Sequence, residues 1–255
     1  MNFKSSNPAM KAFEQTENLS LGPVDQFVGD SSQRMTINGT INKTGLMILI
    51  AMVTGAWGWD KVISSPQLLM PFFWTSLVVS IAAVFAIRAR PEWASTVGPV
   101  YAAVEGVFLG ALSGILEMSW PGIAVQAAMA TMATVVGMLI AYRTGVIRAT
   151  PYFRKVIVTA TMGIMVFYGI SIIASLFGFN FSVNSFGNSS MLSIGLSLFI
   201  VVIAAMNLIL DFDFIEKGAN EGAPKHMEWY GAFGLMVTIV WLYIEMLRLI
   251  SKLRD

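Results

Sequence analysis

Seven apolar runs, most of them close to twenty residues long, constrain this chain more than any other feature of its sequence. An α-helix rises about 1.5 Å per residue, so about twenty residues cross the roughly 30 Å hydrocarbon core of a bilayer. Apolar residues make up 56% of the 255 residues and charged residues only 12%, which is typical of membrane proteins. We therefore expect an all-α membrane protein with seven transmembrane helices. The runs are Thr44–Trp59, Leu68–Ile87, Gly98–Leu116, Gly122–Tyr142, Val156–Phe177, Met191–Leu210 and Trp229–Ile250.

A polar segment, residues 1–43, precedes the first run, which is the shortest of the seven. The segment contains Gly and Pro turn signals and no apolar stretch long enough for a signal peptide. We expect a flexible arm followed by one seven-helix transmembrane domain over residues 44–255. Alternate loops carry 12 Lys and Arg residues on the side of the arm and 4 on the other side. Positive residues are retained in the cytoplasm, so the N-terminus is predicted to be cytoplasmic, although three of the other four, Arg248, Lys252 and Arg254, lie near the C-terminus.

Several classes of function lack the residues that they need. The chain has no cysteine and a single histidine, His226, which removes thiolate sites and the usual zinc sites. No basic patch typical of nucleic-acid binding is present, so no nucleic-acid partner is expected. Ser113 has no histidine partner within any run. We therefore expect neither an enzyme nor a cofactor.

Two carboxylates, Asp211 and Asp213, end the sixth run. An acid at the edge of a membrane helix costs free energy and is a functional candidate for that reason. Helical spacing places Asn207 and Asp211 on one face, whereas Asp213 points about 200° away and shares its face with Lys217. Asp211 is therefore the better candidate to face the protein interior. Asp213 is expected to be a solvated interfacial residue paired with Lys217.

Three further acids lie within a run or directly before one. Glu105 is about seven residues into the third run, roughly 10 Å deep. It must be protonated, face water or meet a cation such as Arg88 or Arg90, and a functional role and a structural buried pair are both open. Glu228 opens the last helix and is the acid most able to reach Asp211 directly. Glu245 has Arg248 at i+3, a structural ion-pair spacing.

A stripe of glycines marks a packing face in the third run. Gly106, Gly110 and Gly114 recur every four residues, which lets a neighbouring backbone approach closely. The fourth run has a similar surface of small residues, and a short turn containing Pro121 joins the two. We expect these two helices to form a tight hairpin.

The order of these features resembles the Bax inhibitor family, in its bacterial branch with a long polar arm. The resemblance rests on Tyr101-Ala-Ala-Val-Glu105-Gly106 in the third run, on Asp211-Phe-Asp-Phe-Ile215 after the sixth, and on the last helix ending Met246-Leu-Arg-Leu-Ile250. It covers about residues 44–252. It implies a fold in which a central last helix is wrapped by the other six. It also implies a pH-sensitive calcium leak controlled by one aspartate after the sixth helix and another in the seventh.

Asp211 matches the first of those aspartates, and Trp229–Ile250 contains no counterpart of the second. The resemblance also implies an arginine near the second helix, for which Arg88 or Arg90 is a loose match. The leading hypothesis is a multi-pass inner-membrane protein that leaks cations, with Asp211 as a transient calcium ligand. The alternative is a non-conducting protein that binds a membrane protease and modulates proteolysis or stress responses. The candidate residues for an ion pathway or pH gate are Asp211, Asp213, Glu105, Glu228, Arg88 and Arg90.

Overall fold

A computed structural model describes residues 33–178 and 185–255, and these residues form helices and no β-strand. Seven of the helices are long and apolar enough to cross a membrane, which confirms the expected number. Short 3-10 turns, Pro66–Leu68 and Pro91–Trp93, lead into the second and third of them. The helices are α2 (Ile37–Ser64), α3 (Leu69–Ala89), α4 (Ala94–Ser119), α5 (Ile123–Arg143), α6 (Pro151–Leu176), α7 (Met191–Asn220) and α8 (Met227–Arg254).

Two helices extend well beyond the apolar runs that predicted them. The first run was expected to be the shortest, but α2 has 28 residues and begins at Ile37, inside the segment predicted to be an arm. The Thr36 side chain caps it by accepting from the backbone N–H of Gly39 at 3.0 Å. At the other extension, α7 continues ten residues past Leu210, so Asp211 and Asp213 lie within the helix. Hydropathy marks the membrane boundary, whereas caps and backbone hydrogen bonds decide where a helix ends. The predicted arm over residues 1–32 lies outside the described residues.

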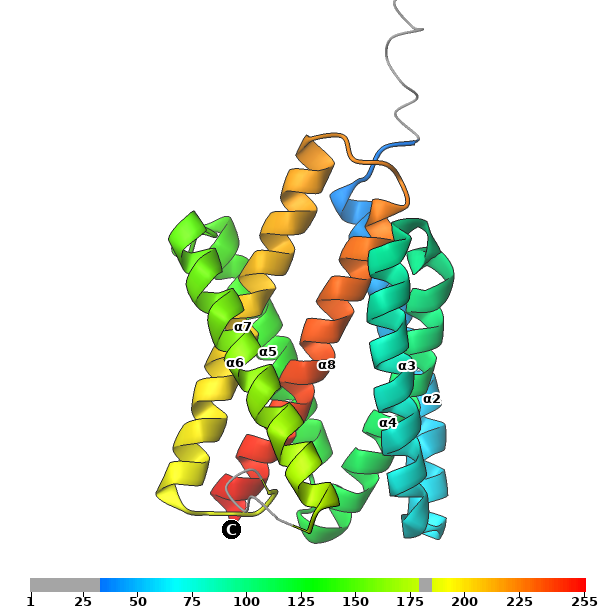
Figure 1. Ribbon diagram of the computed structural model, residues 1–255, viewed down its shortest axis with the longest axis vertical. Coiled ribbons are helices and arrows are strands. Elements are labelled where there is room, and N and C mark those ends of the chain that lie inside the picture. Colours follow the sequence, from blue (N-terminus) through cyan, green and yellow to red (C-terminus); the bar gives the residue numbers. More distant parts are fainter. Residues whose placement is uncertain (1–32, 179–184) are drawn as a thin grey trace, which may run out of the picture. The chain divides into compact units, whose positions relative to one another are not determined.

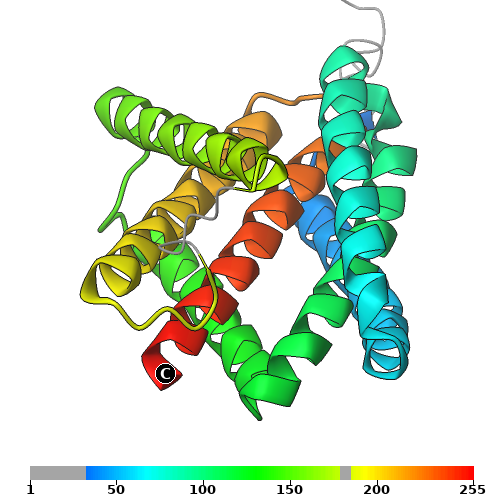
Figure 2. The same ribbon diagram turned by 60° about the horizontal axis from the view of Figure 1, so that its bottom comes forward.

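The last helix, α8, has the central position that the resemblance implied (Figures 1 and 2). It packs against α2 and α4 on one side and against α5 and α7 on the other. The outer helices α3 and α6 pack mainly on α4 and α7, respectively. Half of the most apolar stretch of α8 is buried, compared with about a tenth of α3 and α6. Polar groups on α8 are therefore shielded by the bundle, whereas most of α3 and α6 faces outward.

The glycine stripe of α4 packs against α2, not against α5 as predicted. A Cβ atom added at Gly110 would overlap the backbone carbonyl group of Gly55, and one at Gly58 would overlap that of Val107. The α2–α4 contact is the most extensive pairing of helices in the chain, while α4 and α5 diverge from their connection (Figure 2). The predicted tight hairpin of α4 and α5 is therefore wrong. Short connections bring helix ends together, but the matching glycines on α2 decide which backbone approaches.

Candidate functional site

Asp211 lines a pocket of about 350 Å³ between α6, α7 and α8, as its helical phase predicted for an inward residue. One of its carboxylate oxygens, Oδ2, is buried and has no hydrogen-bond partner among the described residues. Gly231 and Gly234 of α8 also line the pocket, and a Cβ atom added at Gly234 would lie 3.8 Å from Oδ1 of Asp211. The other lining residues are Arg154, Val158, Leu210, Phe214 and Tyr230. We refer to this cavity as the Asp211 pocket.

Asp213 points away from the pocket and takes part in two ion pairs. Lys217, one turn along α7, lies 2.7 Å from Oδ2, which confirms the predicted pair. Arg154 of α6 reaches the same oxygen at 2.7 Å. Asp213 is only 7% exposed, so the expectation that it would be solvated is wrong. The reason is that α6 packs across this face of α7 and brings Arg154 over the carboxylate.

Arg154 is the residue that connects the two aspartates, and the sequence did not single it out. It pairs with Asp213 and also lines the pocket that contains Asp211. Thr150 accepts from the backbone N–H of Phe153 and Pro151 is the first helical residue, so α6 begins just before Arg154. This capping signal places an arginine in the first turn of α6, but only packing shows that it faces α7.

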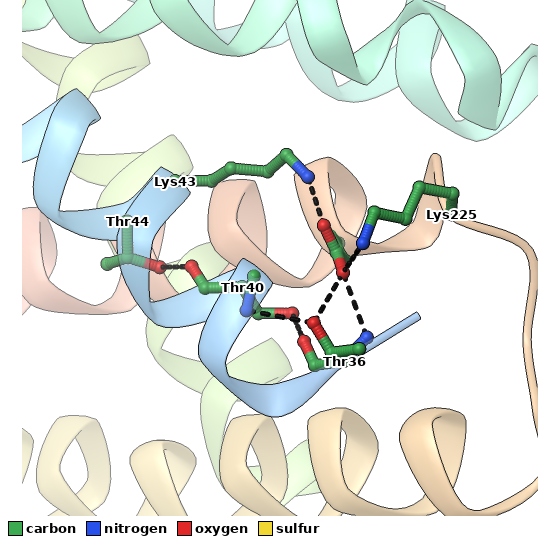
Figure 3. A network of polar contacts seen from close by, with 7 residues as sticks. Thr36, Thr40, Lys43, Thr44 and Lys225 are labelled. Carbon is green, nitrogen blue, oxygen red and sulfur yellow. Dashed lines mark hydrogen bonds and ion pairs between the residues drawn. The ribbon is translucent and has the colours of Figure 1, made fainter. Parts of the chain in front are cut away.

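Glu228 does not approach Asp211, and that part of the prediction is wrong. Its carboxylate is fully buried in a polar network at the start of α2 (Figure 3). Thr36 donates to Oε1 from its backbone N–H at 2.9 Å and from its hydroxyl at 2.8 Å. Lys225 lies 3.0 Å from Oε1, and Lys43 donates to Oε2. The carboxylate occupies the space beside Gly39, where a Cβ atom would overlap it. We call this arrangement the Glu228 latch.

Glu105 is buried, as expected for an acid inside the membrane, but neither arginine reaches it. Ser76 and Ser80, one turn apart on α3, donate hydrogen bonds to its Oε2, the Ser80 bond being 3.2 Å long. Arg88 and Arg90 are exposed near the end of α3, and Arg90 lies over the ring of Trp93. Both a functional and a structural role were open for Glu105, and these contacts with two serines are typical of a structural role. The i, i+4 spacing of Ser76 and Ser80 is the feature of the sequence that could have predicted them as the partners of Glu105.

A second polar cluster, around the buried Glu245, lies toward the C-terminal end of α8. Arg248 donates to both carboxylate oxygens of Glu245, at 2.7 and 2.8 Å, so the predicted pair is present. Tyr168 of α6 donates to Glu245 at 2.5 Å and accepts from Arg248 at 2.6 Å. Glu245 is 1% exposed. We refer to Tyr168, Glu245 and Arg248 as the far-end cluster.

Lys252 comes two residues after the apolar run Trp229–Ile250, yet it lies inside α8 and is buried. Its ammonium group donates to the Ser197 hydroxyl at 2.8 Å and to the Ser193 carbonyl at 3.3 Å, both on α7. Across the described residues, no group of three or more His, Cys, Asp or Glu side chains is arranged to hold a metal ion. Asp211 therefore belongs to no such group in the described part of the chain, and several carboxylates do not meet there to form a calcium cage.

These features define a class: a seven-helix membrane protein that, over the described residues, has one carboxylate oxygen buried without a partner and four buried acids that bind neighbouring side chains. Comparison with known families identifies the chain further. A model of the family described as Bax inhibitor 1 like matches residues 3–255, so the protein belongs to this family. Neither a curated protein nor a solved structure gives a significant match.

Proposed function

We propose that the protein is a cation leak, permeable to calcium, in which Asp211 controls permeation. The observation that carries the proposal is the buried Oδ2 of Asp211, which has no hydrogen-bond partner among the described residues and faces a pocket of about 350 Å³. A buried polar atom without a partner is costly, and a charged one more so. A hard cation such as Ca²⁺ is bound by oxygen atoms and would offset that cost while it occupies the pocket. The lack of further carboxylates favours passage over tight binding.

Protonation of Asp211 is expected to reduce the leak. The charged and titratable groups around it are Arg154 of α6 and Tyr230 of α8, which line the same pocket. Since Arg154 is already paired with Asp213, Asp211 supplies the unpaired negative charge in the pocket. A protonated carboxyl loses that charge and with it the attraction for a cation. Acidification should therefore lower calcium influx, and the response should require Asp211.

The proposal places the protein in a bacterial inner membrane with its N-terminus in the cytoplasm. The three basic residues near the C-terminus opposed this orientation in the count of loop charges. Lys252 is instead buried in the bundle and bonds to Ser197. Arg248, with a side chain only 11% exposed, is paired with Glu245. They are therefore not loop charges, and the positive-inside rule favours the cytoplasmic N-terminus more clearly.

The test uses the full-length protein in liposomes loaded with a calcium-sensitive dye. Asp211→Asn keeps the size of the side chain and removes its charge, so influx should fall about tenfold, equivalent to roughly 1.4 kcal/mol of lost attraction. Glu105→Gln is the matched control, because it neutralises another intramembrane acid outside the pocket. The wild type should lose influx on acidification and Asp211→Asn should not.

Two results would contradict the proposal. An absence of influx for the wild type at every pH would exclude the leak. Equal influx and equal pH response in the wild type and Asp211→Asn would exclude Asp211 as the controlling residue.

A further inference from the structure

Two of the helices that form the Asp211 pocket, α7 and α8, contact each other near both ends. A Cβ atom added at Gly234 of α8 would lie 3.8 Å from Asp211 of α7. Eighteen residues away along each helix, Lys252 of α8 donates to the carbonyl oxygen of Ser193 of α7. The same ammonium group also donates to the Ser197 hydroxyl at 2.8 Å, one turn along α7. The two helices are thus antiparallel, and positions between these points can be paired to within about one turn.

One turn from the pocket lies a layer of neutral polar side chains. Asn207 of α7 donates to the Thr161 hydroxyl of α6 at 2.8 Å. The register places Thr238 of α8 at the level of Asn207, and the Thr238 side chain is 8% exposed. These groups are suited to replace water around a small cation that enters from the Asp211 pocket, because each has an oxygen atom to offer.

Seven residues further along both helices, the register pairs Ile200 of α7 with Glu245 of the far-end cluster. Tyr168 of α6 bonds to Glu245, so α6 contributes at this level too. At about 1.5 Å per residue, this second polar layer lies roughly 10 Å from the Asn207 layer. The same three helices therefore carry polar groups on both sides of a gap of about two turns.

Three isoleucines fill that gap. Ile164 of α6 and Ile200 and Ile203 of α7 belong to one buried cluster, and Trp241 of α8 packs against it. Their exposures are 6%, 1% and 6%, so no continuous aqueous path passes between them in this structure. An apolar constriction of this kind stops ions because water leaves it. We refer to Ile164, Ile200 and Ile203 as the isoleucine gate.

We infer that cations cross along the α6–α7–α8 interface, from the Asp211 pocket to the far-end cluster, and that the isoleucine gate closes this route. The inference rests on the proposed leak and assigns its path. The glycine-packed α2–α4 pair lies on the other side of α8 and carries no part of the route. Beyond the gate, Glu245 is the first carboxylate that a cation reaches, and Arg248 and Tyr168 hold it in the closed arrangement.

The flux test replaces one gate residue with a small polar one. Ile203→Ser should raise calcium influx into dye-loaded liposomes about tenfold, as for a barrier lower by about 1.4 kcal/mol. Val202→Ser is the matched control, since Val202 is the next residue on α7 and is 41% exposed on the outer surface. Adding Asp211→Asn to Ile203→Ser should remove the increase, because both residues lie on one route.

A labelling test does not depend on conduction. The chain has no cysteine, so single cysteines report their own accessibility. A cationic methanethiosulfonate added on the side of the Asp211 pocket should modify Asn207→Cys, and should modify Ile200→Cys about ten times more slowly. Combining Ile200→Cys with Ile203→Ser should remove most of that difference, and combining it with Val202→Ser should not.

The outcomes separate the route from the leak itself. If the wild type conducts, Asp211→Asn reduces influx and Ile203→Ser changes neither influx nor labelling, the route is overturned and the proposed function stands. If no variant conducts, the proposed leak is overturned. An increase that persists after Asp211→Asn would show that Ile203→Ser opens a different path, which also overturns the route.

Discussion

Replacing Glu228 with glutamine should destabilise the protein through the Glu228 latch. Glutamine keeps an oxygen for the two hydrogen bonds from Thr36, but its NH₂ group takes the place of Oε2 opposite the Lys43 ammonium. The side chain of Lys43 is 19% exposed, so the lost charged hydrogen bond costs about 1.5–3 kcal/mol. Lys225 is 44% exposed, and its pair contributes about 0–1 kcal/mol. The expected loss of stability is therefore about 1.5–4 kcal/mol.

The measurement is thermal unfolding in detergent followed by circular dichroism at one scan rate. A loss of that size should lower Tm by roughly 3–16 °C for a chain of this length. Lys43→Met tests the assignment. The double variant Lys43→Met with Glu228→Gln removes both charges, so its loss of stability should be smaller than the sum of the two single losses. An unchanged Tm for Glu228→Gln, or losses that simply add in the double variant, would refute the latch as the source of stability.

Two further predictions follow from the packing of α2. Gly110→Ala should lower the free energy of unfolding by about 1–3 kcal/mol, because the new Cβ atom would overlap the Gly55 carbonyl group. Gly137→Ala is the control: the space at its Cβ position is open, so Tm should be unchanged or slightly higher. Removing residues 1–32 should leave Tm and calcium influx unchanged, because the Glu228 latch and the hydrogen bond from Met35 to Ala223 lie beyond the cut. If the truncated protein no longer co-purifies with a membrane protease, the alternative function as an interaction protein gains support. A fall in calcium influx would contradict the prediction that the leak does not require residues 1–32.

The number of membrane helices and the direction in which several side chains point follow from the sequence alone. The thickness of the hydrocarbon core sets the length of an apolar run, so seven runs became seven helices. The helical period separated Asp211 from Asp213 and predicted the pair of Asp213 with Lys217, because both lie on one helix at i, i+4 spacing. The pair of Glu245 with Arg248 follows from the same local geometry.

The helix that each of these faces meets depends on how the seven helices pack together. Glu228 binds Lys43, which is 185 residues away, and Glu105 binds serines of α3 instead of Arg88 or Arg90. The glycine stripe of α4 met α2 and not its neighbour in sequence. Asp211 faces the protein interior, as its helical phase predicted. The position of Arg154 next to both aspartates, in contrast, follows only from the packing of α6 against α7. Helical phase specifies the direction of a side chain, whereas its partner depends on packing between segments that are distant in the chain.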